Sequence, residues 1–82
     1  MNNTEEKLIK VFETTFSDLP ADRIKSATQE TTPNWDSVAA ITLMNLIEEE
    51  FEIQMDFEDL GELTSFQKIL VYVNGKLAQA AA

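Results

Sequence analysis

The chain has 82 residues, no cysteine and no histidine, and its six Lys and Arg against fifteen Asp and Glu give a formal net charge of −9. This composition excludes disulfide scaffolds and thiolate metal sites, and such acidity argues against nucleic acid as a partner. The apolar runs are too short to span a bilayer and the polar N-terminus does not resemble a signal peptide, so we expect a cytoplasmic monomer whose partners carry basic patches.

The first predicted helix covers residues 3–16. Its apolar residues recur at helical spacing and mark one core-facing side; they are Leu8, Val11, Phe12 and Phe16. Asn3 and Glu6 have the spacing of a capping pair at its start. Residues 17–36 follow as a long loop, with at most a short turn near residues 22–25. Connections of this length are uncommon in compact domains and are usually functional or mobile.

The second predicted helix covers residues 37–51, and a short helix or turn is expected over 56–61. The last helix is predicted over 64–77, from a capping box of Thr64 and Gln67 to a stop at Asn74-Gly75, with residues 78–82 left as a tail. Its apolar stripe consists of Phe66, Ile69, Leu70, Val73 and Leu77. No β alternation persists. The sequence therefore predicts one domain over 1–82, an all-α four-helix bundle of three main helices and one short helix.

The second predicted helix has more apolar residues than its core face needs. A helical projection places one broad apolar arc toward the core; it contains Ala39, Ala40, Leu43, Leu46, Ile47 and Phe51. Val38 and Ile41 fall instead on the polar side, with Met44 on the boundary and Glu48 and Glu49 nearby. Single exposed apolar residues are common, but this group suits a docking surface with an apolar centre and an acidic rim.

Ser37 stands at the predicted start of that helix, directly after Asp36. It is not expected to be a hydrolytic nucleophile, because the chain has no histidine and neither a Ser-x-x-Lys nor a Gly-x-Ser-x-Gly motif surrounds it. Either Asp36 or Ser37 can serve as the helix cap, which is the simplest role for both. A helix N-terminus also favours a phosphate, so an accessible Ser37 is a candidate attachment point.

The segment "WDSVAAITLMNLIEEEFEIQMDFEDLGELTSFQKILVYVNGKL", residues 35–77, resembles the second half of an acyl carrier protein. The shared pattern is Asp-Ser followed by an apolar residue, Glu-Glu-Glu-Phe at the helix end, an acidic segment, and a Thr-Ser start to the last helix. The resemblance implies that Ser37 carries 4′-phosphopantetheine, donated by coenzyme A through a phosphopantetheinyl transferase, with Asp36 as the supporting acid. It further implies that Val38, Ile41, Met44, Glu48 and Glu49 contact partner enzymes.

A carrier of this kind would be non-catalytic and would hold acyl groups as thioesters for acyl-transferring or acyl-modifying enzymes of fatty-acid, polyketide or related biosynthesis. Val38 and Thr42 replace a leucine and a glutamate typical of fatty-acid carriers, and Pro33 and Trp35 replace a glycine-containing lead-in. These differences favour a dedicated or secondary pathway. The alternatives are a carrier of aminoacyl, peptidyl or other cargo, and an unmodified acidic adaptor.

Two further features of the sequence bear on ligand binding. The segment Asp56–Gln67 imitates a calcium-binding loop but lacks two key ligands, so no metal site is expected beyond weak divalent binding at Asp56 and Glu58. Met44, Leu46 and Met55 are candidates to line a cavity for cargo, although ordinary core packing is the favoured interpretation.

Overall fold

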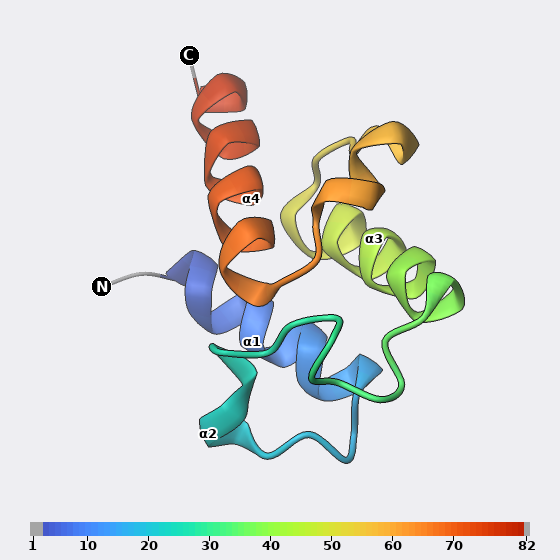
Figure 1. Cartoon of the computed structure of the whole chain (residues 1–82). Helices are drawn as coiled ribbons and strands as arrows, with labels where there is room; N and C mark the ends of the chain where they lie inside the picture. Colours follow the sequence, from blue (N-terminus) through green and yellow to red (C-terminus); the bar gives the residue numbers. More distant parts are fainter. Residues whose placement is uncertain (1–2, 82) are drawn as a thin grey trace.

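The computed structural model describes residues 3–81, with only the backbone path given at 3, 80 and 81. This part of the chain forms α1 (Asn3–Thr15), α2 (Ala21–Ile24), α3 (Ser37–Phe51), the 3₁₀ helix η1 (Phe57–Glu62) and α4 (Phe66–Ala81) (Figure 1). It contains no strand, only an isolated antiparallel bridge between Thr28 and Ser65. The all-α prediction is confirmed, with three long helices and one more short helix, α2, than expected.

Helix α1 is the centre of the packing, because it contacts α2, α3 and α4 (Figure 1). Its predicted stripe is buried, with Leu8 and Phe12 fully enclosed. The apolar faces of the other long helices close over it; they supply Leu43, Ile47 and Phe51 from α3 and Phe66, Ile69, Leu70 and Val73 from α4. Helical spacing therefore identified the core correctly. None of the described helices is long and apolar enough to cross a membrane.

The connection between α1 and α3 is folded onto the core. Ile24, Ala27 and Trp35 are buried along it, so it contributes apolar side chains of its own. The backbone also pairs with the start of α4, because the Gln29 N–H donates to Thr64 O (2.8 Å) and the Phe66 N–H donates to Ala27 O (3.0 Å). The segment passes from α2 beneath α4 to the start of α3 (Figure 1). These contacts fix a connection whose length alone suggests mobility.

Helix α4 differs from the prediction at both ends. Ser65 caps it, since its Oγ accepts the Lys68 N–H at 3.1 Å, so the helix begins at Phe66 and the expected cap by Thr64 is wrong. The expected stop at Asn74-Gly75 is also wrong, because the helix continues to Ala81 through most of the expected tail. Gly75 does not adopt a positive φ, and the alanines that follow favour helix.

The remaining bounds differ from expectation by at most one residue. Helix α1 ends at Thr15 where residue 16 was expected, and η1 covers 57–62 where 56–61 was expected. Helix α3 has the expected bounds. The proposed cap by the Asn3 side chain lies outside the described side chains.

Candidate functional site at the start and outer face of α3

Asp36 is the cap of α3, and Ser37 is the first helical residue. The Asp36 side chain accepts the Ala39 N–H at 2.9 Å, and its backbone carbonyl accepts the Ala40 N–H at 2.9 Å. The Ser37 side chain is exposed, and none of the hydrogen bonds among the described residues involves its hydroxyl. Of the two residues able to cap this helix, Asp36 does so, which leaves the Ser37 hydroxyl available for other chemistry.

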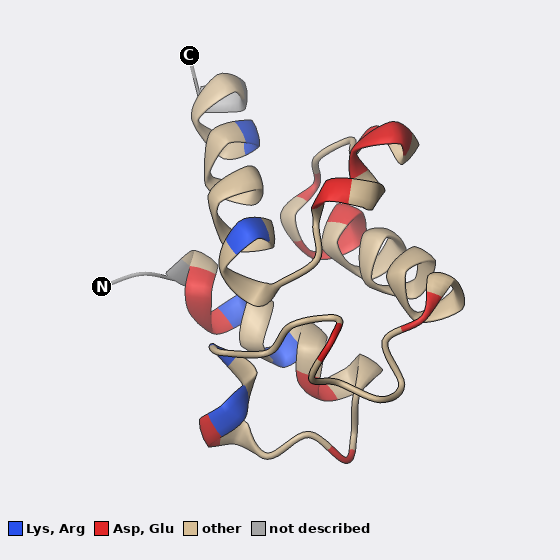
Figure 2. Ribbon diagram, viewed as in Figure 1, with Lys and Arg blue, Asp and Glu red and all other residues tan. Residues whose placement is uncertain are grey.

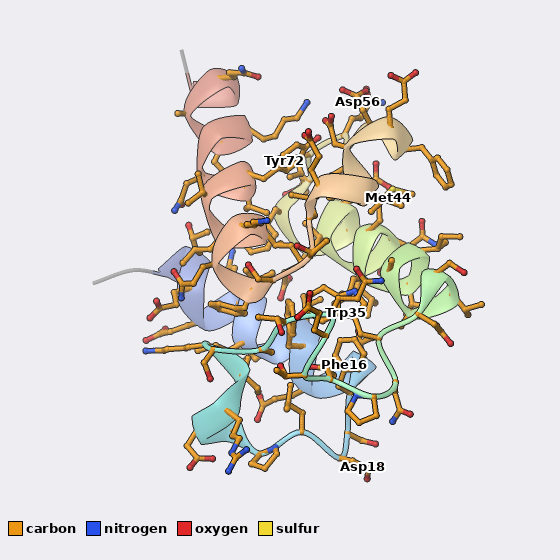
Figure 3. All side chains as sticks on the ribbon, in the orientation of Figure 1. Phe16, Asp18, Trp35, Met44, Asp56 and Tyr72 are labelled. Atoms are coloured by element: carbon orange, nitrogen blue, oxygen red, sulfur yellow. The ribbon has the colours of Figure 1, made fainter. Side chains whose placement is uncertain are left out.

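The residue before this pair anchors the helix tip in the core. Trp35 is 4% exposed and lies edge-on to Phe12, with ring centroids 5.5 Å apart. It also packs against Phe16 at 5.5 Å, and Figure 3 shows the labelled Trp35 and Phe16 one above the other, to the left of the start of α3. The Trp35 N–H donates to Thr32 O at 3.0 Å. Ser37 is therefore presented by a well-packed lead-in, although the side chain itself faces solvent.

The first turn of α3 suits an attached phosphate group. The first N–H groups of a helix have no intrahelical partner, and the positive end of the helix dipole lies beside them. Asp36 satisfies the N–H groups of Ala39 and Ala40, so those of Ser37 and Val38 remain to face an anion. An exposed hydroxyl next to two free donors fits a phosphodiester there. The Asp36 carboxylate opposes that charge, but its hydrogen bond to Ala39 holds it in the capping position.

The outward side of α3 carries apolar residues near Ser37. Val38 is 70% exposed and Ile41 is 38% exposed, while Met44 is half-buried at the edge of the core. Acidic residues lie just before α3, at its far end and on η1, whereas its middle turns carry none (Figure 2). The outward side of α3 therefore exposes apolar side chains in its first turns, with carboxylates before and after them.

Glu48 occupies a different environment from its neighbour Glu49. Its side chain is half-buried, and Oε2 accepts the Met55 N–H at 2.9 Å. The chain reverses between Glu48 and Met55 at Glu52, whose left-handed backbone (φ 53°, ψ 46°) ends α3. Glu49 is exposed and lies beside a shallow depression between α1 and α3 that Lys10 also lines. Glu48 thus has a structural partner that the helical projection does not reveal, whereas the Glu49 side chain makes no hydrogen bond or ion pair with the residues whose side chains the structure describes.

A polar cluster that the sequence did not suggest joins α4 to η1. The Tyr72 hydroxyl donates to Asp59 Oδ2 at 2.8 Å and accepts the Asp56 N–H at 3.3 Å. Burial raises the pKa of Tyr72, and its hydrogen bond to Asp59 acts in the same direction, against the Asp56 N–H and Lys76. Lys76 Nζ lies 5.5 Å from the Tyr72 ring centroid and 3.9 Å from Asp56 Oδ2. The labelled Tyr72 and Asp56 lie near one another above the core in Figure 3.

The geometry gives little support to a divalent-cation site at Asp56 and Glu58 or to a cargo cavity beside Met44. No group of three possible metal ligands occurs among residues 3–81, and Asp56 and Glu58 are both exposed. Met44 and Met55 do line a gap between α3, η1 and α4, but its volume is about 10 Å³. That is about the volume that one water molecule needs. Leu46 borders the depression beside α1 instead.

Residues 35–73 match the family described as a phosphopantetheine attachment site, so the exposed serine and its capped helix lie in a carrier domain of that class. The chain is also 32% identical over 76 residues to an acyl carrier protein of Buchnera aphidicola subsp. Schizaphis graminum (strain Sg), an alignment that covers 93% of this chain and 96% of that protein. The chain therefore belongs to the acyl carrier protein family. Its prosthetic group is a covalently attached 4′-phosphopantetheine, as the sequence predicts.

Family membership also defines the general class of partner. Carrier proteins of this family are generally non-catalytic. They interact with a phosphopantetheinyl transferase, which attaches the arm, and with enzymes that handle acyl groups.

Proposed function

We propose that Ser37 is the residue to which 4′-phosphopantetheine is attached, and that the chain carries acyl groups for partner enzymes without catalysing a reaction itself. The observation that carries this proposal is the free, exposed hydroxyl of Ser37 at the first turn of α3, where Asp36 performs the capping. In the attachment, Ser37 Oγ loses its proton and forms a bond to the pantetheine phosphate of coenzyme A, whose 3′,5′-ADP portion leaves. The arm supplies the terminal thiol that holds an acyl group as a thioester.

The contribution of the protein is presentation and recognition. The free N–H groups of Ser37 and Val38 stabilise the charge of the phosphodiester. Val38, Ile41 and Met44 form the apolar centre of the partner contact, and Glu49 and other exposed carboxylates attract basic residues around it. We assign Glu48 mainly to holding the chain reversal after α3, because its carboxylate already accepts the Met55 N–H.

The pathway we favour is a dedicated or secondary one within fatty-acid, polyketide or related biosynthesis, with the protein acting as a monomer in the cytoplasm. Val38, Thr42 and Trp35 support this choice, because they differ from the residues typical of general fatty-acid carriers. Trp35, which differs from the glycine-containing lead-in of such carriers, is a large aromatic that packs on Phe12 and Phe16. Val38 and Thr42 change the side chains on the outward side of α3, which is the surface that we expect a partner enzyme to contact.

The experiment that tests the attachment is intact-mass measurement after incubation with coenzyme A and a phosphopantetheinyl transferase. We expect the wild type and the control Ser17→Ala, which alters another exposed serine, to gain the mass of one phosphopantetheine. Ser37→Ala should gain nothing while its circular dichroism stays that of the wild type. A wild type that remains unmodified would favour an unmodified adaptor. Modification of Ser37→Ala would refute the assignment of the residue.

A further inference from the structure

The short helix η1 exposes a large aromatic side chain. Phe57 is its first residue and is 66% exposed, although phenylalanine is among the residues that proteins most often bury. None of the ring pairs or cation–ring contacts among the described residues involves Phe57. The ring is therefore available to another molecule.

Helix α4 holds η1 by the residues on either side of this ring. A 3₁₀ helix has three residues per turn, so residues three apart lie on the same side of it. Asp56 and Asp59 are such a pair, since the Asp59 N–H donates to Asp56 O at 2.9 Å. The Tyr72 hydroxyl on α4 binds both, accepting the Asp56 N–H and donating to Asp59 Oδ2. The side of η1 that carries this pair therefore faces α4, and Phe57 is held in place on another side.

The side of η1 that carries Phe57 is the side next to α3. Phe57 precedes Leu60 by three residues, so 3₁₀ spacing places both on one side of η1. Leu60 is half-buried and lines the gap beside Met44 of α3. Figure 3 shows the labelled Met44 where α3 approaches η1. The apolar part of the proposed docking surface on α3 therefore continues onto η1 and reaches the Phe57 ring.

The charged side chains next to the ring are carboxylates. Helix η1 contains acidic residues and no basic one (Figure 2). Asp59 is engaged by Tyr72, but the Glu58 side chain is exposed and makes no hydrogen bond or ion pair with the described residues. A cation that lies on the Phe57 ring therefore meets a free carboxylate from the next residue. The chemistry of this corner fits a positively charged group with an apolar or planar surface.

The exposed Val71 of α4 has different surroundings. It is 70% exposed, as much as Phe57, but it has no ring on which a cation could lie. The depression beside it is also lined by Lys68 and Glu62, so the carboxylate there already has a lysine near it. Helix α4 itself contains no acidic residue. An exposed aromatic ring, a free carboxylate and continuity with the apolar side chains of α3 therefore coincide at η1 and not at α4.

We propose that Phe57 and Glu58 bind an arginine side chain of an acyl-handling partner enzyme, an inference that rests on the proposed carrier function and on docking at α3. The guanidinium group lies flat on the Phe57 ring and pairs with the Glu58 carboxylate, while apolar residues of the partner cover the outward side of α3. Arginine suits this corner better than lysine, because its group is planar, less strongly hydrated and able to form two parallel hydrogen bonds with a carboxylate. The two residues thus discriminate among enzymes that all carry basic patches.

The test uses two synthetic amphipathic helical peptides as probes. One contains leucine and arginine, and the other has lysine at every arginine position, so their charges are equal. Each is titrated into the isotope-labelled chain by NMR at about 150 mM salt, where long-range attraction between charges is screened. The arginine peptide should bind about three-fold more tightly, which corresponds to one exposed cation–ring contact. Its shift changes should include Phe57 and Glu58 as well as Val38 and Ile41.

Substitutions separate the ring from the charge. Phe57→Leu keeps an apolar side chain without the ring and should abolish the preference for arginine. Glu58→Gln should weaken binding of the arginine peptide about two-fold, as expected for an exposed ion pair. Val71→Ala and Glu13→Gln are the matched controls, because they change an exposed apolar residue of α4 and an exposed glutamate of α1. Both should bind the two peptides as the wild type does, and all four variants should keep its circular dichroism.

The outcomes distinguish this inference from the carrier function. Equal affinity of the two peptides for the wild type would overturn the inference, as would a preference for arginine that survives in Phe57→Leu. Loading of Ser37 is measured separately by intact mass. A chain that loads but does not prefer arginine would refute this inference alone. A chain that does not load would refute the attachment, and with it the identity of the partner as an acyl-handling enzyme.

Discussion

The hydrogen bond between Glu48 and Met55 provides a direct test of which acidic residues hold the fold and which remain free. The carboxylate accepts the Met55 N–H at 2.9 Å across the reversal that follows α3. Met55 is itself 8% exposed, so water replaces this bond poorly when the carboxylate is removed. Glu48→Ala is therefore expected to destabilise the protein.

The size of the effect follows from the type of bond. Hydrogen bonds to charged groups contribute about 1.5–3 kcal/mol, and the half-buried position of Glu48 favours the lower part, about 2 kcal/mol. Unfolding entropy of about 2.1 cal/mol/K per residue amounts to roughly 0.17 kcal/mol/K over this chain. Glu48→Ala should therefore lower Tm by about 12 °C.

The assay is thermal and urea unfolding monitored by circular dichroism, with Glu49→Ala as the matched control. Glu49 is the adjacent, exposed glutamate of the same helix, so the exchange has the same charge and nearly the same helix propensity. Its Tm should change by less than about 3 °C. Glu48→Gln keeps an acceptor and should lose less than Glu48→Ala. Equal losses in Glu48→Ala and Glu49→Ala would refute the structural role of Glu48.

Four further substitutions test other parts of the structure. Gly75→Ala should raise the free energy of unfolding by about 0.5–1 kcal/mol in urea titrations, because the glycine lies inside α4 with open space around its Cα. A lower free energy of unfolding would indicate that the helix ends at Gly75 instead. Tyr72→Phe should lower it by about 1 kcal/mol by removing the bond to Asp59. The raised pKa of Tyr72 adds stability that is complete below about pH 10 and is lost as pH rises through the folded-state pKa. The free energy of unfolding of the wild type should therefore fall more steeply in alkali than that of Tyr72→Phe. Parallel pH profiles of the two proteins would contradict this. The buried Thr32 Oγ1 has no hydrogen-bond partner among the described residues, so Thr32→Val should raise the free energy of unfolding by about 1 kcal/mol. Thr31→Val should lower it, because the Thr31 hydroxyl bonds to that of Thr28, and equal effects of the two substitutions would contradict this difference.

Most of the fold was accessible from the sequence because its signals are local and periodic. Leu8, Phe12 and the stripe of α4 lie in the core because helical spacing places them on one face. The ends of α4 were not accessible in this way. Thr64 and Ser65 are equally good caps by residue type, and the choice depends on pairing with Ala27 and Gln29, far away in the chain. Gly75 is a common helix stop only where it adopts a positive φ, which no pattern specifies.

Part of the candidate site could also be predicted from the sequence. The Asp36-Ser37 pair and the exposure of Val38 and Ile41 follow from residue types and one helical period, although their roles in attachment and docking stay predictions. The hydrogen bond of Glu48 to the Met55 N–H was not foreseen, because a projection of one helix does not include the backbone that returns after Glu52, and the docking role of Glu48 stays a prediction. The hollow lined by Phe16, Leu19, Pro33 and Asn34 was missed because residues 17–36 have no regular pattern, and its walls come from both sides of α2.

The burial of Trp35 has a consequence for how the protein matures. The indole side chain links the approach to Ser37 with Phe12 and Phe16 of the N-terminal region, so the shape of the helix tip depends on the assembled core. On the proposed attachment at Ser37, a transferase that contacts this tip would meet the geometry described here only after the N-terminal and central regions have come together, so modification would depend on prior folding.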